Sequence, residues 1–257
     1  VAHALKAPFY RDRLAAANIA PEDIRSLADL PRLPLTARED LDHHGPSLWA
    51  VPPEAVADLA LTSGTTGPPV QVPYTAGDLA RLAYNETMSF YGTGTRGGDR
   101  CLVCVTLDRC FIAGLAYYQG IVGLGATAIR SGSGQPARQW ELISLLRPTV
   151  LVGLTAQAGL FDKDILGTMA AVDPRPVILP LSNPNSRSEC TPQEVYEATR
   201  GLGLIATGSP FPPAAAAGRT LLASQCNNMY VFPGVGLGAL VSRASRVTSG
   251  MFLAASR

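Results

Sequence analysis

An alternation of short apolar runs with helix-like segments constrains the fold of this chain more than any other feature. Five such runs alternate with four helical segments between residues 101 and 207. Parallel strands joined by crossover helices produce this order. We therefore predict an α/β fold with a mostly parallel, Rossmann-like sheet and helices on both faces. The expected strands are 101–106, 126–129, 149–154, 176–181 and 204–207, with helices at 113–124, 137–146, 162–171 and 191–199 between them and a further strand at 228–232 before a final helix from near Gly236.

The first hundred residues show a different pattern. Prolines break residues 1–50 into short helices and turns. Two apolar runs, residues 58–61 and 70–74, then flank a loop rich in Ser, Thr and Gly, and a helix is expected over 76–91. This part of the chain therefore predicts a β-hairpin followed by one long helix.

Composition excludes several classes of function. Charged residues make up only 16% of the chain and hydrophobic residues 47%, against roughly 25% charged in average proteins, so a large core is expected. The net charge is +1, which implies no basic face and makes nucleic acid an unlikely partner. The sequence does not decide whether the chain forms a homo-oligomer.

The membrane and the secretory pathway are also disfavoured. Residues 110–129 carry no charged side chain and are flanked by arginines at positions 109 and 130. Four glycines divide this stretch into a helix and a strand, and buried elements of α/β proteins have the same apolar character. The N-terminus lacks the pattern of a signal peptide. The five cysteines are irregularly spaced and do not form a disulfide framework. We therefore expect a cytoplasmic protein without a membrane span.

The loop between the two apolar runs of the hairpin is a candidate phosphate site. Glycines allow main-chain N–H groups to approach a polyphosphate, and hydroxyl groups add further donors. An ordinary surface turn is the alternative interpretation, because Ser, Thr and Gly are also the residues of loops. The candidate cofactor-binding residues are Thr62, Ser63, Gly64, Thr65, Thr66 and Gly67.

This loop resembles the signature loop of the AMP-forming (adenylate-forming) ligases, within their phenylacetate-CoA ligase branch. The resemblance covers residues 1 to about 150 and is supported by the segments 8–11, 30–34, 125–127 and 147–153. It implies ATP with magnesium as a cofactor and an aryl or acyl acid as substrate. Members of that family continue into an adenine pocket and a C-terminal domain with a catalytic lysine, whereas Lys163 is the only lysine after Lys6 here.

Polar clusters follow three successive strands in the second half of the chain. Because the carboxyl ends of parallel strands line the ligand crevice of an α/β sheet, such residues are expected to meet there. The alternative is that Asn-Pro and Gly-Ser-Pro only begin turns. The clusters occupy residues 181–184, 206–211 and 225–228.

These clusters, with residues 232–238 and 246–248, resemble the C-terminal half of the NAD(P)-binding domain of malic enzymes. The match covers about 148 to 257. It implies NAD(P) as cofactor, with Ser209 on the cofactor side, and a dicarboxylate, L-malate, bound by Asn183, Asn227 and Asn228. An amide suits this role because it donates to a carboxylate and accepts from a hydroxyl.

The two resemblances predict two domains, 1–150 and 151–257, that join within residues 147–154. Malic enzymes carry their Tyr acid, Lys base, three metal-binding carboxylates and Gly-rich turn before the segment matched here, where ligase-like residues stand instead. We therefore expect a catalytically incomplete fusion with residual nucleotide or dicarboxylate binding, inactive as an isolated chain. The alternatives are an acyl-CoA ligase fragment and a non-functional recombinant.

Two further patterns are interpreted as structural. Residues 92–97 fit the dinucleotide-binding pattern but follow a helix and precede a strand, which is the wrong order, and residues 234–239 lack the acidic residue that should follow. Cys101, Cys104 and Cys110 lack a nearby fourth ligand for zinc. We assign no catalytic residue and no metal ligand from the sequence.

Overall fold

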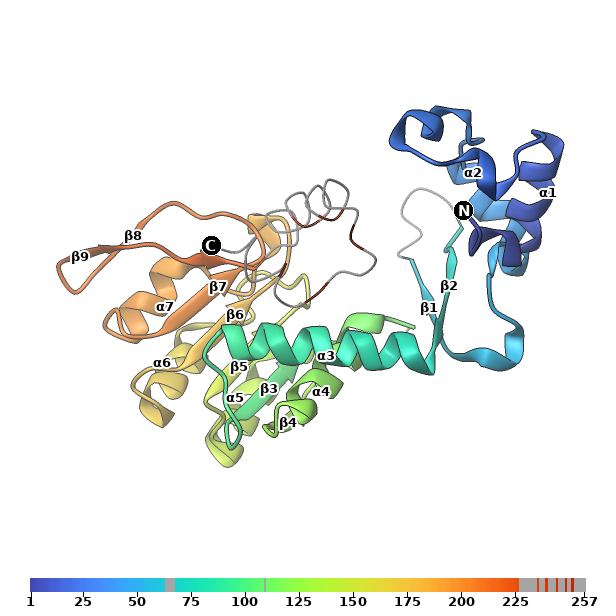
Figure 1. The fold of residues 1–257 in the computed structure, drawn as a ribbon. Helices are drawn as coiled ribbons and strands as arrows, with labels where there is room; N and C mark the ends of the chain where they lie inside the picture. The colour runs from blue at the N-terminus through green and yellow to red at the C-terminus, as the bar shows by residue number, and fades with distance from the viewer. Residues whose placement is uncertain are drawn as a thin grey trace. The chain divides into compact units, whose positions relative to one another are not determined.

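The structure, a computed structural model, describes residues 1–62, 68–108 and 110–226, together with Val235, Ala239, Ala244, Thr248 and Met251. The chain forms two compact units (Figure 1). Unit 1 comprises Val1–Met88 and Leu107–Gly123, and unit 2 comprises Ser89–Thr106 and Leu124–Arg257.

Unit 1 consists of short helices and one β-hairpin. The two hairpin strands, β1 and β2, are antiparallel and pair from Val56↔Thr75 to Leu61↔Gln71, which confirms the predicted hairpin. Arg13 donates to Asp40 over 2.5 Å and so links the first two α-helices. The elements are η1 (Ala4–Lys6), α1 (Pro8–Ala16), η2 (Pro21–Asp23), η3 (Leu27–Arg32), α2 (Arg38–His44), η4 (Gly45–Leu48), η5 (Pro53–Ala55), β1 (Val56–Leu61), β2 (Gln71–Thr75), most of α3 (Ala76–Gly92) and α4 (Ile112–Gly123).

The uncharged stretch at 110–129 divides as predicted. It forms α4, which is 12 residues long, and most of β4 (Thr127–Arg130). Gly125 between them has φ +82°, a conformation that glycine adopts without steric cost. Among the described residues, no helix combines the length and the apolar character needed to cross a membrane.

Unit 2 is built on a six-stranded sheet whose neighbouring strands are all parallel, in the order β10-β7-β6-β5-β3-β4. This confirms the predicted Rossmann-like fold. Its elements are β3 (Arg100–Cys104), β4, α5 (Pro136–Leu146), β5 (Val150–Gly153), α6 (Lys163–Val172), β6 (Val177–Pro180), η6 (Asn185–Arg187), α7 (Pro192–Ala198), β7 (Leu204–Thr207), β8 (Ala214–Ala216), β9 (Arg219–Leu221) and β10 (Ser224–Gln225).

Strand β5 lies inside the sheet, with a neighbour from each half of the chain. It pairs with β3 on one side, where Cys104 opposes Gly153, and with β6 on the other, where Gly153 opposes Pro180. All residues of β5 and β6 are buried, as expected for parallel strands covered on both faces. Strand β5 therefore joins strands from residues 100–104 and residues 177–180 in one sheet.

Helix caps and apolar packing hold the helices of unit 2 in place. Asp162 caps α6 by accepting from the Ile165 N–H over 2.9 Å. Thr191 and Glu194 form a reciprocal capping box at the start of α7. The buried core joins strand residues to residues of the helices and loops, among them Leu151, Ile178, Phe161, Ile165, Met169 and Val195.

The sequence missed one part of unit 2. Residues 214–221 form an antiparallel pair, β8 and β9, and the short β10 then joins the main sheet beside β7. These strands are only two or three residues long, so they give no alternating pattern to detect. The strand predicted at 228–232 and most of the final helix lie outside the described residues.

Candidate functional site

The carboxyl edge of the sheet collects the polar residues of unit 2. Thr155 follows β5, Ser182 and Asn183 follow β6, and Gly208 and Ser209 follow β7. The strand order also reverses between β3 and β5, because β4 lies beyond β3 while β6 and β7 lie beyond β5. Open α/β sheets bind their ligands at this edge, near such a reversal.

Asn183 and Ser209, predicted from different strand ends, are hydrogen-bonded to each other. Ser209 Oγ donates to Asn183 Oδ1, although 26 residues separate them. Both side chains belong to exposed or partly exposed residues. Since Oδ1 accepts from Ser209, the Nδ2 group is left to donate, and no acceptor for it is found among the described residues. The pair therefore presents an amide donor at the carboxyl edge.

Gly208 allows the two strand ends to approach closely. A Cβ atom at this position would overlap the main-chain carbonyl oxygen of Leu181 and would lie 3.0 Å from Asn183 Oδ1. Asn185 adds a second tie between the loops, since its Nδ2 donates to the Pro210 carbonyl over 2.7 Å. The peptide bond between Asn183 and Pro184 is cis.

A buried carboxylate, Glu189, lies beneath these loops. Its exposed fraction is 0%, and Oε1 accepts from Ser182 Oγ over 2.5 Å and from Thr155 Oγ1 over 2.8 Å. Sequence reasoning missed it, because a glutamate between Ser188 and Cys190 resembles an ordinary surface residue. The only available signal was its position near the end of the Asn-Pro loop.

Burial disfavours the ionised form of the buried thiols in unit 2. Burial raises the pKa of Cys104 to about 12, and it raises the pKa of Cys190 well above its ordinary value. The thiolate is the nucleophilic form of cysteine. Both residues therefore remain protonated thiols. Of the three cysteines interpreted from the sequence as buried core thiols, Cys101 and Cys104 are buried, whereas Cys110 is exposed, so the interpretation was wrong for Cys110. Within residues 1–62, 68–108 and 110–226, no group of three His, Cys, Asp or Glu side chains is arranged to hold a metal ion.

The predicted phosphate loop is described only at its first residue. Thr62 Oγ1 accepts from the Val70 N–H over 2.9 Å, and the Thr62 N–H donates to the Val70 carbonyl over 3.1 Å. These two bonds close the base of the loop between β1 and β2. Ser63, Gly64, Thr65, Thr66 and Gly67, like Asn227 and Asn228, lie outside the described residues.

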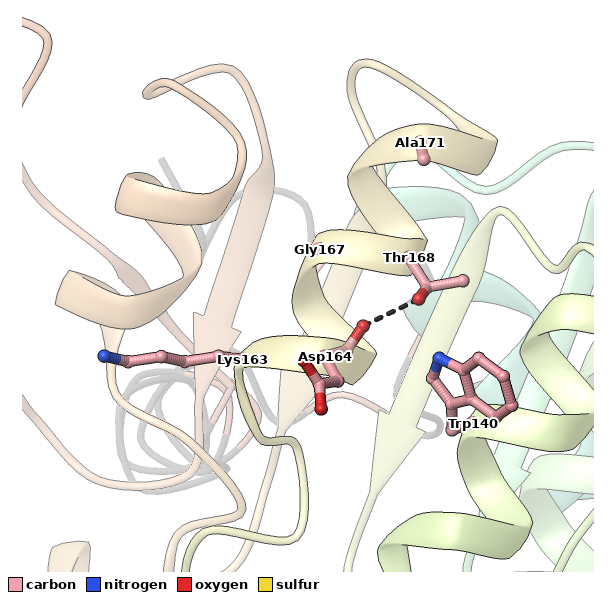
Figure 2. A pocket seen from close by; sticks show the side chains of 6 residues that line it. All are labelled: Trp140, Lys163, Asp164, Gly167, Thr168 and Ala171. Atoms are coloured by element: carbon pink, nitrogen blue, oxygen red, sulfur yellow. Dashed lines mark hydrogen bonds between the residues drawn. The ribbon is translucent and has the colours of Figure 1, made fainter.

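An open hollow of about 560 Å³ lies between α5 and α6 (Figure 2). Trp140 of α5 forms one wall, and residues of α6 from Lys163 to Ala171 form the other. Thr168 Oγ1 donates to the main-chain oxygen of Asp164, so this hydroxyl is used within the helix. Of the predicted ligand-binding residues, Thr62, Asn183 and Ser209 are described, and none of these three lines this hollow.

Comparison with known proteins identifies the family. The family model "Malic enzyme, NAD binding domain" matches residues 128–257. The chain belongs to the malic enzyme family. Its match begins in β4, before the junction predicted at 147–154, and contains Asn183, Ser209, Asn227 and Asn228.

Curated malic enzymes resemble part of the chain. The NAD-dependent malic enzyme of Pseudomonas aeruginosa (strain UCBPP-PA14) is 47% identical over 116 residues, which are 45% of this chain and 21% of that protein. The NAD-dependent malic enzyme of Sodalis glossinidius is 48% identical over 117 residues, 46% of this chain and 21% of that protein. The chain thus spans about a fifth of the length of these malic enzymes.

Solved ligase structures share the fold. A 2-hydroxyisobutyryl-CoA ligase in complex with 2-HIB-AMP and CoA, in the thioesterification state, matches with a TM-score of 0.58 and 21% identity over 79% of this chain and 45% of that chain. The same enzyme in the postadenylation state matches with a TM-score of 0.55 and 21% identity over 71% of this chain and 40% of that chain. At this identity the likeness shows the fold alone, and it extends into the malic enzyme segment.

Proposed function

We propose that the carboxyl edge of the sheet binds L-malate and the nicotinamide end of NAD(P). The observation that carries the proposal is the hydrogen bond between Ser209 and Asn183, which joins the ends of β7 and β6. It is supported by the malic enzyme match, which contains both residues. In this proposal Asn183, Asn227 and Asn228 hold the dicarboxylate, and Ser209 lies on the cofactor side.

The chemistry of Asn183 fits a dicarboxylate. Its Oδ1 accepts the Ser209 proton, and this orients Nδ2, which carries two N–H donors. A hydrogen bond from a neutral donor to a charged carboxylate is stronger than one between neutral groups. Asn183 therefore acts as a fixed donor, and Ser209 as the group that fixes it.

The proposed activity of the isolated chain is binding without turnover. Oxidative decarboxylation needs a metal to polarise the forming carbonyl and an acid and a base to move protons. The family resemblance places those groups before the matched segment, where this chain resembles a different family. We therefore assign no catalytic residue to this chain.

Calorimetric titration with L-malate in the presence of NAD tests the proposal. Asn183→Asp keeps an oxygen for Ser209 but replaces the amide donor with a second acceptor, so we expect malate to bind at least tenfold more weakly. Ser186→Asp is the matched control, because it adds the same charge to an exposed residue of η6, and we expect a change of less than threefold. Equal weakening by both substitutions, or no binding by the unsubstituted chain, would contradict the proposal.

The hairpin of unit 1 supports a second candidate function, the binding of ATP phosphates at residues 62–67. The Thr62 and Val70 bonds close the base of this loop between paired strands. We expect ATP with magnesium to slow hydrogen exchange at these residues, and Thr66→Ala to remove that protection. Equal exchange with and without ATP would leave the loop as a turn.

A further inference from the structure

We infer that Glu189 is a positioning residue that locks the loops after β5 and β6 together and thereby fixes Asn183. The inference deepens the proposed function and relies on it for the identity of the ligand. The positioning role of Glu189 itself is inferred from the geometry of the two loops.

The donors around Glu189 converge on one oxygen of its carboxylate group. Oε1 accepts from Ser182 Oγ, from Thr155 Oγ1 and, over 2.8 Å, from the Thr155 N–H, while Oε2 lies 3.4 Å from the Ser182 N–H. A carboxylate accepts only, at about four lone-pair sites. Three of the four contacts fall on Oε1, and one of these donors, the Thr155 N–H, is shared with Ser182 Oγ. Among the described residues no Lys or Arg forms an ion pair with Glu189.

The direction of each hydrogen bond follows from the neighbouring donors. Ser182 Oγ accepts from the N–H groups of Thr155 and Ala156, over 3.1 and 2.8 Å. Its single proton must therefore point to Glu189. Thr155 Oγ1 accepts from the Gln157 N–H over 3.1 Å, so its proton points to Glu189 as well. Both hydroxyl groups are oriented by the carboxylate.

This network adds side-chain hydrogen bonds between the loop after β5 and the loop after β6. Ser182 and Glu189 bracket residues 183–188, the segment that carries Asn183, and their bond closes its base. The Phe161 N–H donates to the Glu189 carbonyl over 3.0 Å, and the Gly159 N–H donates to the Ser188 carbonyl over 3.3 Å. The end of this segment is thus also tied to the loop after β5.

Two local features show that the site is built around this carboxylate. Ala156 has φ +56°, which is unfavourable for a residue with a Cβ atom, and its N–H is held by Ser182. Gly153 leaves room for the glutamate, because a Cβ there would lie 2.8 Å from Glu189 Cδ and 2.7 Å from Phe161 Cζ. Strained residues persist where the surroundings fix them, commonly at ligand sites.

The test uses Glu189→Gln in the whole chain. Glutamine places an N–H donor where the carboxylate accepts hydrogen bonds, so this donor would face the donors of Thr155 and Ser182 without an acceptor between them. We expect amide hydrogen exchange of Thr155, Ala156 and Ser182 to accelerate at least tenfold, the side-chain amide resonances of Asn183 to shift, and the Kd for L-malate with NAD to rise about tenfold. Glu194→Gln is the matched control, because Glu194 also accepts from a main-chain N–H and a hydroxyl, those of Thr191, but at the start of α7.

Unchanged exchange and unchanged Asn183 resonances in Glu189→Gln would overturn the inference, as would equal changes in Glu194→Gln. If Glu189→Gln does not fold, Ser182→Ala replaces it. We then expect faster exchange at Ala156 together with shifted Asn183 resonances, and their absence would overturn the inference. If the unsubstituted chain does not bind malate, the proposed function fails, whereas exchange and resonances still decide the role of Glu189.

Discussion

The close approach of the ends of β6 and β7 at the proposed site depends on the absence of a side chain at Gly208. We predict that Gly208→Ala forces the ends of β6 and β7 apart, because the new methyl group would overlap the Leu181 carbonyl oxygen. Overpacking of this kind costs about 1 to 3 kcal/mol. Urea unfolding measures this loss, and malate binding should weaken with it.

Gly167→Ala provides the control for the same chemical change. Gly167 lies inside α6, and a Cβ atom there would meet nothing within 4 Å. Alanine favours a helix over glycine by about 1 kcal/mol, so this substitution should stabilise the protein. A loss of stability equal to that of Gly208→Ala would contradict the assignment of close packing to Gly208.

The burial of Glu86 in α3 leads us to predict that the stability of the folded protein depends on pH. Burial raises its pKa from 4.5 to about 7. Between these values the unfolded chain ionises Glu86 while the folded chain does not, so the free energy of unfolding falls as pH rises from 4.5 and levels off above 7. The full loss is at most about 3 kcal/mol. Glu86→Gln should remove this part of the pH dependence.

Urea unfolding at pH 4, 6 and 8 measures the effect as the difference between each variant and the unsubstituted chain. For Glu86→Gln, the free energy of unfolding should increase relative to that of the unsubstituted chain as pH rises. Glu141→Gln is the control, because Glu141 is an exposed side chain paired with Arg138, and its difference should change little with pH. A Glu86→Gln difference that stays constant would show that Glu86 is not held neutral by burial.

Single residues differ in how well the sequence predicts them. Asn183 and Ser209 were singled out because they follow strands of the expected sheet and because their segments resemble the malic enzyme NAD(P)-binding domain. The structure joins them by a hydrogen bond, and their binding roles stay predictions. Glu189 was not predicted, because its donors come from Thr155, in the loop after β5, and from Ser182, at the start of the loop after β6. A buried charge is recognised only when the fold shows which donors surround it.

At the scale of elements, the start of α6 gives the clearest prediction. Asp162→Ala removes the side-chain cap on the Ile165 N–H and should cost about 1 kcal/mol. Asp162→Asn should retain most of the stability, because asparagine caps helices equally well. Asp164→Ala removes the same charge from the first turn without removing the cap, and should cost less than about 1 kcal/mol. Thermal unfolding of the three variants measures these differences, and equal losses in all three would contradict the capping role.

Elements with a long, clear pattern were predicted to within a few residues. The helix expected at 162–171 is α6 (Lys163–Val172), and the strand expected at 204–207 is β7 (Leu204–Thr207). Strand ends were predicted less accurately, since β3 stops at Cys104 although the strand was expected to continue to residue 106. A strand ends where its hydrogen bonds to the neighbouring strand end, and the sequence of the strand alone does not predict this position.

At the scale of the whole molecule, the two resemblances meet in one sheet. The parallel sheet was predicted from the alternation of strands and helices, and the pairing of β5 with β3 and β6 continues this sheet across the predicted junction. The prediction of the fold succeeded because this alternation runs from residue 101 to residue 207. The position of the junction within 147–154 stays a prediction, because β5 continues the sheet without interruption.

For the whole chain we predict binding without turnover. Purified protein with malate, NAD and manganese should form no NADH, and with ATP and phenylacetate should release no pyrophosphate. A metal and acid–base groups supply several kcal/mol and about 10² to 10⁴ in rate, respectively, and we propose that this chain does not carry them. Steady turnover that disappears in Asn183→Ala or Thr66→Ala would show that the chain carries a complete active site.

A nuclear magnetic resonance titration tests the central claim most directly, because it locates the ligand as well as detecting it. Saturating L-malate with NAD should shift the side-chain amide resonances of Asn183 and the main-chain amides of Gly208 and Ser209. The indole N–H of Trp140, in the hollow between α5 and α6 (Figure 2), should stay unchanged. A shift of Trp140 with none at Asn183 would place the ligand elsewhere and contradict the account.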